Sequence, residues 1–156
     1  MVVGIGAWVA KRGYNIGVMP ALDKHHAVVR NALIKDGWTI TDDPLTIRVG
    51  KRKLFADLGA ERVLSAEKGT RKIAVEIKTF RRVSTVEDLQ GAVGQFVVYR
   101  DLLAETDADR EAYVAVPDET ISGIFAEEIG QILLRRGSIR VFGYDIITET
   151  ITKWLP

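Results

Sequence analysis

Three residues whose side chains suit phosphate chemistry, Asp57, Glu76 and Lys78, lie close together along the chain. Asp57 ends the apolar run 54–56, and Glu76 and Lys78 lie inside the run 73–79. In an extended strand, side chains two residues apart project from the same face, so a strand at 73–79 presents Glu76 and Lys78 together. If Asp57 lies on a neighbouring strand, the two carboxylates can share a divalent metal ion, with the Lys78 ammonium beside them.

This set of groups suits the hydrolysis of a phosphodiester. The reaction needs the phosphate charge neutralised, a deprotonated water aligned with the leaving oxygen, and a stabilised leaving group, and Mg²⁺ or Mn²⁺ supplies most of this. Mg²⁺ prefers carboxylate oxygens and keeps several waters, so two acids and a backbone carbonyl are sufficient protein ligands. The alternative interpretation is an ordinary ion pair between Glu76 and Lys78, because this spacing also arises by chance in a chain of this composition.

Positive charge is concentrated around these residues. The whole chain has a net charge of +1, but residues 46–82 contain eleven of its 22 lysines and arginines and only four acids. A local excess of this kind is typical of a surface that binds phosphates. The alternative is that these charges are solvated ends of strands and turns. The predicted DNA contacts are Arg48, Lys51, Arg52, Lys53, Arg81 and Arg82.

Hydrophobic periodicity predicts the elements that must position the site. Alternation is clearest at 73–79, where Ile73, Val75 and Ile77 occupy one face, and residues 85–105 follow a helical period. A strand, a long helix and a strand between 73 and 116 predict a right-handed crossover between parallel strands. The expected fold class is α/β, with a mixed central β-sheet flanked by α-helices. The other predicted elements are helices at 23–36 and 121–135, strands at 38–40, 113–116, 139–142 and 146–154, and a hairpin at 45–57.

Length and composition indicate one globular unit. A chain of 156 residues, 47% of them hydrophobic, is long enough to bury a sizeable core. The absence of cysteine excludes disulfides, thiolate zinc sites and cysteine nucleophiles, and favours the cytoplasm. The apolar run 2–10 is far too short for a membrane span, and Lys11 and Arg12 follow it rather than precede it, which is the wrong order for a secretory signal. We expect an N-terminal appendage at 1–18, a single domain at 19–156 and no membrane association.

The order of the site residues resembles the PD-(D/E)xK nuclease superfamily, which has a restriction-endonuclease-like core. Asp57 and the tripeptide at 76–78 match its signature, with Ala56 in place of the usual proline. On the following helix, Gln95 and Tyr99 match the Q-x-x-x-Y element of RecB-like members. Because they are one turn apart, they share a helix face. The alternative for this pair is a helix surface with a half-buried tyrosine.

From residue 19 to its end the chain is similar to the XisH family, named as controlling factors for excision of the fdxN element, a programmed DNA rearrangement. The resemblance implies that Asp57 and Glu76 bind Mg²⁺ (or Mn²⁺) and that Lys78 is catalytic. His26 occupies a place on the first helix where related nucleases often have an acid, so its ring is expected to reach a metal-bound water or a phosphate. The alternative for His26 is a partly packed helix histidine. The matching segments include MPALDKHHAVVRNALIKDGWTITDDPLTI, DLQGAVGQFVVYR and ITKWLP.

Two functional hypotheses follow from this resemblance. The first is a Mg²⁺-dependent endonuclease acting on DNA phosphodiester bonds during element excision. The second is a non-catalytic DNA-binding or recombinase-accessory factor with a nuclease fold. The resemblance implies DNA, an XisI-like companion factor and an XisF-like recombinase as partners, and is compatible with a homodimer through Trp154 or the apolar N-terminus. A third interpretation, a structural domain without nucleic acid, leaves the basic cluster without a purpose.

Overall fold

The structure, a computed structural model, describes residues 21–65, 69–80 and 85–155. The expected appendage at 1–18 and two of the predicted DNA contacts, Arg81 and Arg82, lie outside these ranges. None of the described helices is long and apolar enough to cross a membrane. The elements are α1 (Ala21–Lys35), β1 (Thr39–Asp42), β2 (Leu45–Val49), β3 (Arg52–Ala56), β4 (Leu58–Ser65), β5 (Gly69–Ile77), α2 (Thr85–Thr106), β6 (Arg110–Pro117), α3 (Asp118–Ser122), α4 (Glu128–Arg135), β7 (Val141–Asp145) and β8 (Thr150–Leu155).

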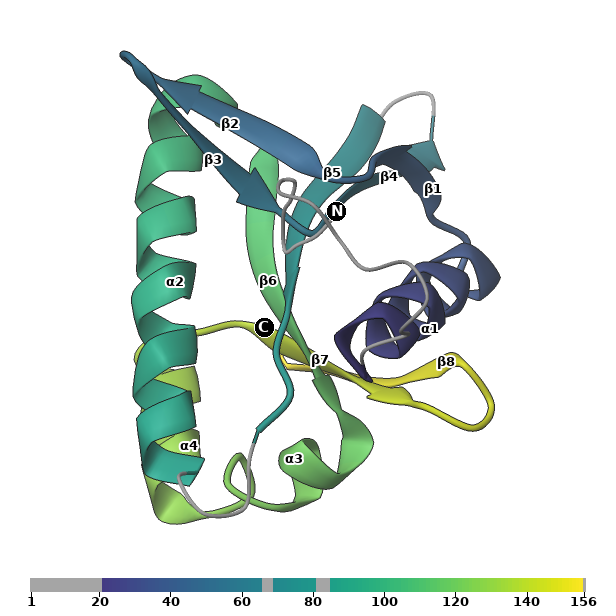
Figure 1. The fold of residues 1–156 in the computed structure, drawn as a ribbon, viewed down its shortest axis with the longest axis vertical. Helices are drawn as coiled ribbons and strands as arrows, with labels where there is room; N and C mark the ends of the chain where they lie inside the picture. The colour runs from purple at the N-terminus through teal and green to yellow at the C-terminus, as the bar shows by residue number, and fades with distance from the viewer. Residues whose placement is uncertain (1–20, 66–68, 81–84, 156) are drawn as a thin grey trace.

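Six strands form one mixed sheet in the order β1-β4-β5-β6-β7-β8. Strands β5, β6 and β7 are parallel, whereas β1, β4 and β8 pair antiparallel with their neighbours. Helix α2 connects β5 to β6, so the predicted crossover between parallel strands is confirmed. Figure 1 shows α1 and α2 on opposite sides of this sheet. The predicted fold class, a mixed central sheet flanked by helices, is confirmed.

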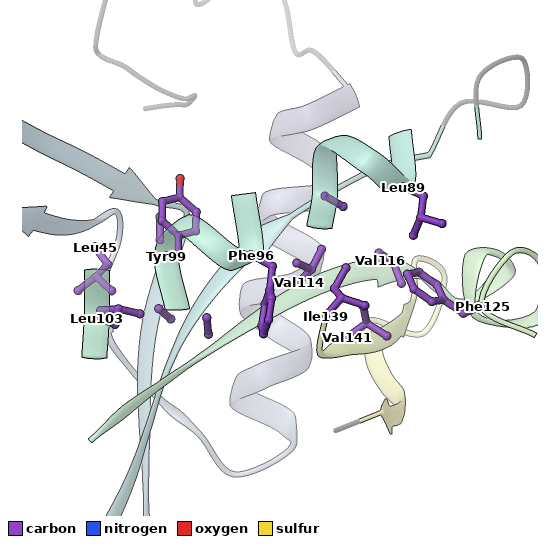
Figure 2. Close-up of a cluster of buried hydrophobic side chains, with 14 of the residues drawn as sticks. Leu45, Leu89, Phe96, Tyr99, Leu103, Val114, Val116, Phe125, Ile139 and Val141 are labelled. Atoms are coloured by element: carbon purple, nitrogen blue, oxygen red, sulfur yellow. The ribbon is translucent and has the colours of Figure 1, made fainter. Parts of the chain in front are cut away.

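Each face of the sheet has its own core. Ile73, Val75 and Ile77 of β5 are buried in the cluster that includes side chains of α1. Ala74 lies in the other cluster, with side chains of α2 and the β2–β3 hairpin, part of which is drawn in Figure 2. The predicted alternation along β5 is therefore confirmed, and it places Glu76 on the side of the sheet that α2 covers.

Strands β2 and β3 form a separate antiparallel hairpin. Leu45 and Ile47 are buried in the same cluster as α2 side chains, and Figure 2 shows Leu45 in that cluster together with Leu103 and Tyr99. At the turn, Gly50 has φ of 59°, a conformation that glycine adopts without steric cost. The predicted hairpin at 45–57 is confirmed, and Figure 1 shows its tip projecting past the end of α2.

The sequence does not predict strand β4. Three consecutive residues near its start, Gly59, Ala60 and Glu61, are of types that are depleted in strands. Pairing with β1 on one side and β5 on the other supplies the hydrogen bonds that override this local preference. Asp57 consequently lies at the bend between β3 and β4 rather than at the end of a strand that pairs directly with β5.

The prediction of one helix at 121–135 is wrong. The chain forms α3 and α4 as two short helices, separated by residues 123–127. Ile124 and Phe125 in this connection are buried in the core. Gly130 of α4 contacts their backbone so closely that a Cβ atom added at Gly130 would lie 2.6 Å from the Phe125 Cα and would collide with the Ile124 carbonyl oxygen.

Gly130→Ala is therefore expected to lower the free energy of unfolding by about 1–3 kcal/mol or more, since the backbone of residues 124–125 must shift to admit the methyl group. The matched control is Gly94→Ala in α2, where an added Cβ meets nothing within 4 Å. The control is expected to raise stability by up to about 1 kcal/mol, the helix propensity difference. Urea unfolding of both variants measures the contrast, and effects of equal size and sign would contradict it.

Candidate metal centre

The register of β4 on β5 brings the two predicted acids together. Leu58 pairs with Val75, so extending the register by one residue sets Asp57 opposite Glu76. The backbone N–H of Ile77 donates a hydrogen bond to Asp57 Oδ2 at 2.7 Å. At the bend, the Asp57 carboxylate takes the place of a backbone carbonyl as the acceptor for the Ile77 N–H. The main chain of β5 therefore holds this carboxylate.

The electrostatics of the pair are those of two acids enclosed in one place. Burial raises the pKa of Asp57, and the Ile77 hydrogen bond and the charges of His26 and Lys78 oppose the rise. Burial also raises the pKa of Glu76 well above its ordinary value, and the neighbouring Asp57 charge adds to the effect. Burial of the two acids together therefore disfavours their ionised forms, a cost that a bound cation would offset.

Helix α2 presents Gln95 and Tyr99 to the same place. Gln95 Nε2 donates to Glu76 Oε2 at 3.3 Å. The Tyr99 hydroxyl donates to the Phe55 carbonyl oxygen at 2.9 Å, and burial and the Glu76 charge raise its pKa. Figure 2 shows the Tyr99 ring in the apolar cluster with its hydroxyl directed away from the other labelled side chains. Both α2 residues predicted from sequence lie at the site.

Within the part of the chain that the structure describes, two buried oxygen atoms at this site have no hydrogen-bond partner, Glu76 Oε1 and Gln95 Oε1. Buried polar atoms are almost always satisfied, so an unpaired pair of acceptors side by side indicates a missing donor or cation. The described residues contain no cluster of three or more histidine or acidic side chains suited to a metal. Two carboxylates with an amide oxygen nonetheless fit Mg²⁺, which keeps several of its waters.

Lys78 completes the predicted set. Its charge lowers the pKa of both Asp57 and Glu76, so it lies within electrostatic reach of the two acids. Its backbone N–H donates to the Ala115 carbonyl oxygen at 2.9 Å, which fixes the end of β5 against β6. A pocket of about 500 Å³ opens beside Lys78, between the end of β5 and the first turns of α2. Of the three residues of the predicted set, Lys78 alone lines this pocket.

His26 lies on α1 at the other side of this site. Its Nε2 is 2.7 Å from Asp43 Oδ1, and Arg30 Nη1 donates to Asp43 Oδ2 at 2.7 Å. Hydrogen bonds from these two side chains lower the pKa of Asp43 against the effect of burial. The His26 charge in turn lowers the pKa of Asp57, so this group of three acts on the metal centre electrostatically.

Sequence reasoning missed Asp43 and Arg30. Asp43 precedes Pro44 and has the signature of a turn, which hides any second role. Asp43 contacts His26 and Arg30 of α1, which lie 17 and 13 residues earlier in the chain. No regular spacing in the sequence predicts contacts over such separations. His25, for which the sequence indicates no separate role, places Nδ1 2.6 Å from the Tyr144 hydroxyl of β7.

Four of the six predicted DNA contacts lie on the hairpin. Arg48 pairs across the two strands with Lys53, and Arg52 and Lys51 lie beside the turn. All four side chains are exposed, and residues 45–56 contain no acid. The structure therefore brings the cations onto one projecting element that leads directly into Asp57.

Comparison with known proteins identifies related chains. The family model described as "XisH protein" matches residues 19–152. A fdxN element excision controlling factor protein from Anabaena variabilis is 39% identical, with a TM-score of 0.75 over 86% of this chain and 99% of that chain. An XisH family protein from Nostoc punctiforme is 38% identical, with a TM-score of 0.75 over 86% of this chain and 100% of that chain. A search of curated proteins finds no match.

Glu76→Gln is expected to raise the free energy of unfolding of the metal-free protein at neutral pH by about 1–3 kcal/mol, because a neutral amide removes a buried, unpaired charge. The folded-state pKa of Glu76 lies above its unfolded value. In the wild type, the protonated Glu76 carboxyl therefore contributes to the free energy of unfolding at low pH. This contribution is lost as the pH rises through the folded-state pKa of Glu76. The advantage of the variant should accordingly vanish in acid.

Urea unfolding of both proteins across the pH range measures this difference. Glu105→Gln, an exposed substitution on α2, is the matched control and should stay within about 0.5 kcal/mol of the wild type at every pH. A Glu76→Gln effect that does not change with pH would contradict the assignment of a raised pKa.

Proposed function

The chain belongs to the XisH family, and from that premise we propose that it is a Mg²⁺-dependent endonuclease acting on DNA phosphodiester bonds. Its Anabaena variabilis relative is named as a controlling factor of fdxN element excision, and excision of a DNA element requires phosphodiester bonds to be broken. The proposal assigns the site to the PD-(D/E)xK type. The observation that carries it is the buried Glu76 Oε1, which has no hydrogen-bond partner among the described residues, with a second acid across the strand pair.

Asp57 and Glu76 are the proposed protein ligands of Mg²⁺ (or Mn²⁺), and Gln95 Oε1 is a third available oxygen. Hard divalent cations take oxygen ligands of these kinds. When bound, the ion supplies charge neutralisation at the phosphate and a more acidic water. One Asp57 carboxylate oxygen, Oδ2, accepts from the Ile77 N–H, and the proposal assigns the other oxygen to the ion.

The remaining side chains divide the other tasks of hydrolysis. Lys78, on the open side of the acids, is positioned to orient the attacking water and to stabilise charge on the phosphate. Gln95 holds the Glu76 carboxylate through Oε2, and Tyr99 fixes the strand that leads into Asp57. His26, held by Asp43, is the proposed contact from α1 to the phosphate.

A second candidate function is a non-catalytic DNA-binding or recombinase-accessory factor that uses the same fold. The observation that favours it is the ligand set, since the described residues offer two clustered carboxylates and no third acid. The word "controlling" in the name of the Anabaena variabilis relative also fits such a factor. Its partners would be DNA, an XisI-like companion factor and an XisF-like recombinase.

Incubation of the purified protein with Mg²⁺ or Mn²⁺ and duplex, single-stranded and branched DNA is expected to give cleavage. Glu76→Ala and Lys78→Ala should each lower the rate by about 10²–10³-fold, the effect of removing one group that stabilises transition-state charge. Glu105→Ala, exposed on α2, is the matched control and should cut at the wild-type rate. Equal cutting by Glu76→Ala and the wild type would exclude this site as the source of the activity.

Calorimetric titration with Mn²⁺ separates the two functions without reference to cleavage. The endonuclease proposal expects binding by the wild type and none by Glu76→Gln, which retains the shape of the side chain but not its charge. It also expects saturating Mn²⁺ to raise the unfolding temperature of the wild type alone. DNA binding by a wild-type protein that takes up no divalent ion would favour the accessory factor.

A further inference from the structure

Phe55 is the only exposed aromatic residue among the side chains that the structure describes, with 51% of its surface accessible. The other described aromatic side chains are buried or half-buried. Single exposed aliphatic residues are common on protein surfaces and need no explanation. The Phe55 ring is distinguished by its neighbours, because the same face of the hairpin carries Arg48 and Lys53.

The alternation of side chains along β3 accounts for the exposure of this ring. Leu54 packs against the core and Ala56 is buried in it, so the alternation of β3 directs Phe55 to the opposite face. Its cross-strand partner is Thr46, which is too small to cover a phenyl ring. The backbone at Phe55 is held by the Tyr99 hydroxyl at 2.9 Å, so the ring projects from a fixed strand.

The charge around the ring identifies the ligand. The next cross-strand pair toward the tip on the same face of the hairpin is Arg48 and Lys53, and the whole hairpin, residues 45–56, has four cations and no acid. A flat apolar face surrounded by positive charge alone is complementary to a polyanion that carries planar groups. Nucleic acid has this combination, because its bases stack on aromatic rings while its phosphates contact lysine and arginine.

The position of Phe55 next to the metal centre indicates which form of DNA fits. Phe55 and Asp57 are two positions apart along the chain, about 6–7 Å in extended backbone. This is about twice the 3.4 Å rise between nucleotides in a stacked strand, so one strand can contact both positions with nucleotides about two apart. The base that stacks on the ring must be unpaired, because within a closed duplex its faces are covered by the neighbouring bases.

We propose that Phe55 is a stacking platform for an unpaired base of single-stranded DNA, adjacent to the phosphate at the Asp57–Glu76 site. The identity of the polymer as DNA rests on the proposed function. The surrounding cations hold the backbone of the same strand, and the ring selects opened or single-stranded DNA over closed duplex.

Fluorescence anisotropy without divalent ions tests the platform independently of cleavage, using matched single-stranded and duplex oligonucleotides. Phe55→Ala is expected to weaken single-strand binding by about 5- to 100-fold, the range for losing one base–aromatic stack, and to change duplex binding less than about 2-fold. Phe55→Trp should retain wild-type affinity, whereas Phe55→Leu, apolar but without a π-face, should behave as Phe55→Ala. The control, Ile147→Ala, removes an 85% exposed side chain outside the hairpin and should have no effect.

A 2-aminopurine base in the single strand reports stacking directly, and its fluorescence should be quenched by the wild type and by Phe55→Trp only. Unchanged single-strand affinity in Phe55→Ala, equal losses on single strand and duplex, or full affinity in Phe55→Leu would each overturn the platform and leave the cleavage proposal standing. A wild type that binds single strands through Phe55 but never cuts DNA would overturn the endonuclease proposal and leave the platform standing.

Discussion

The hydrogen bond from the Ile77 N–H to the Asp57 carboxylate is the contact on which the candidate site depends. It extends the β4–β5 ladder by one step at the point where the chain bends out of β3. Because the acceptor is a side chain, the ladder continues while one carboxylate oxygen remains available to a ligand. The same contact forces Asp57 and Glu76 to face each other in an enclosed place, which costs free energy while both are charged. Lys78 and the His26 group offset part of that cost.

The sequence predicts most of the helices and strands of this chain, but it predicts only some of the contacts between them. The alternation around Glu76 and the helical period around Gln95 predict the faces that the structure confirms. Strand β4 is missed because its propensities are poor and its pairing partners are distant in sequence. Asp43 is missed for the same reason, since its turn signature says nothing of the helix it contacts. The metal, catalytic and DNA-binding roles remain predictions, which the structure makes specific enough to test.

Helix α2 belongs to the core and to the site at once. Leu89, Phe96 and Leu103 are buried in the core beneath it, while Gln95 and Tyr99 bind the strands that bear the acids. Helix α2 must therefore both fill the core and hold the site, and a change in its packing alters the hydrogen bond from Gln95 to Glu76. The unpaired Glu76 and Gln95 oxygens are a local loss of stability within this well-packed region. Such a loss is typical of sites whose geometry is set by a ligand rather than by folding alone.

The β2–β3 hairpin pairs only with itself among the described strands, and it is attached to the core through Leu45 and Ile47 and to α2 through the Tyr99 hydroxyl. Its outward side chains make no contribution to the central sheet. Mutations can therefore accumulate at these positions without unfolding the domain or disturbing the acids. Under the proposed function, substrate preference would reside in the hairpin and bond breaking at the acids, so the two properties could evolve separately through changes confined to a single hairpin.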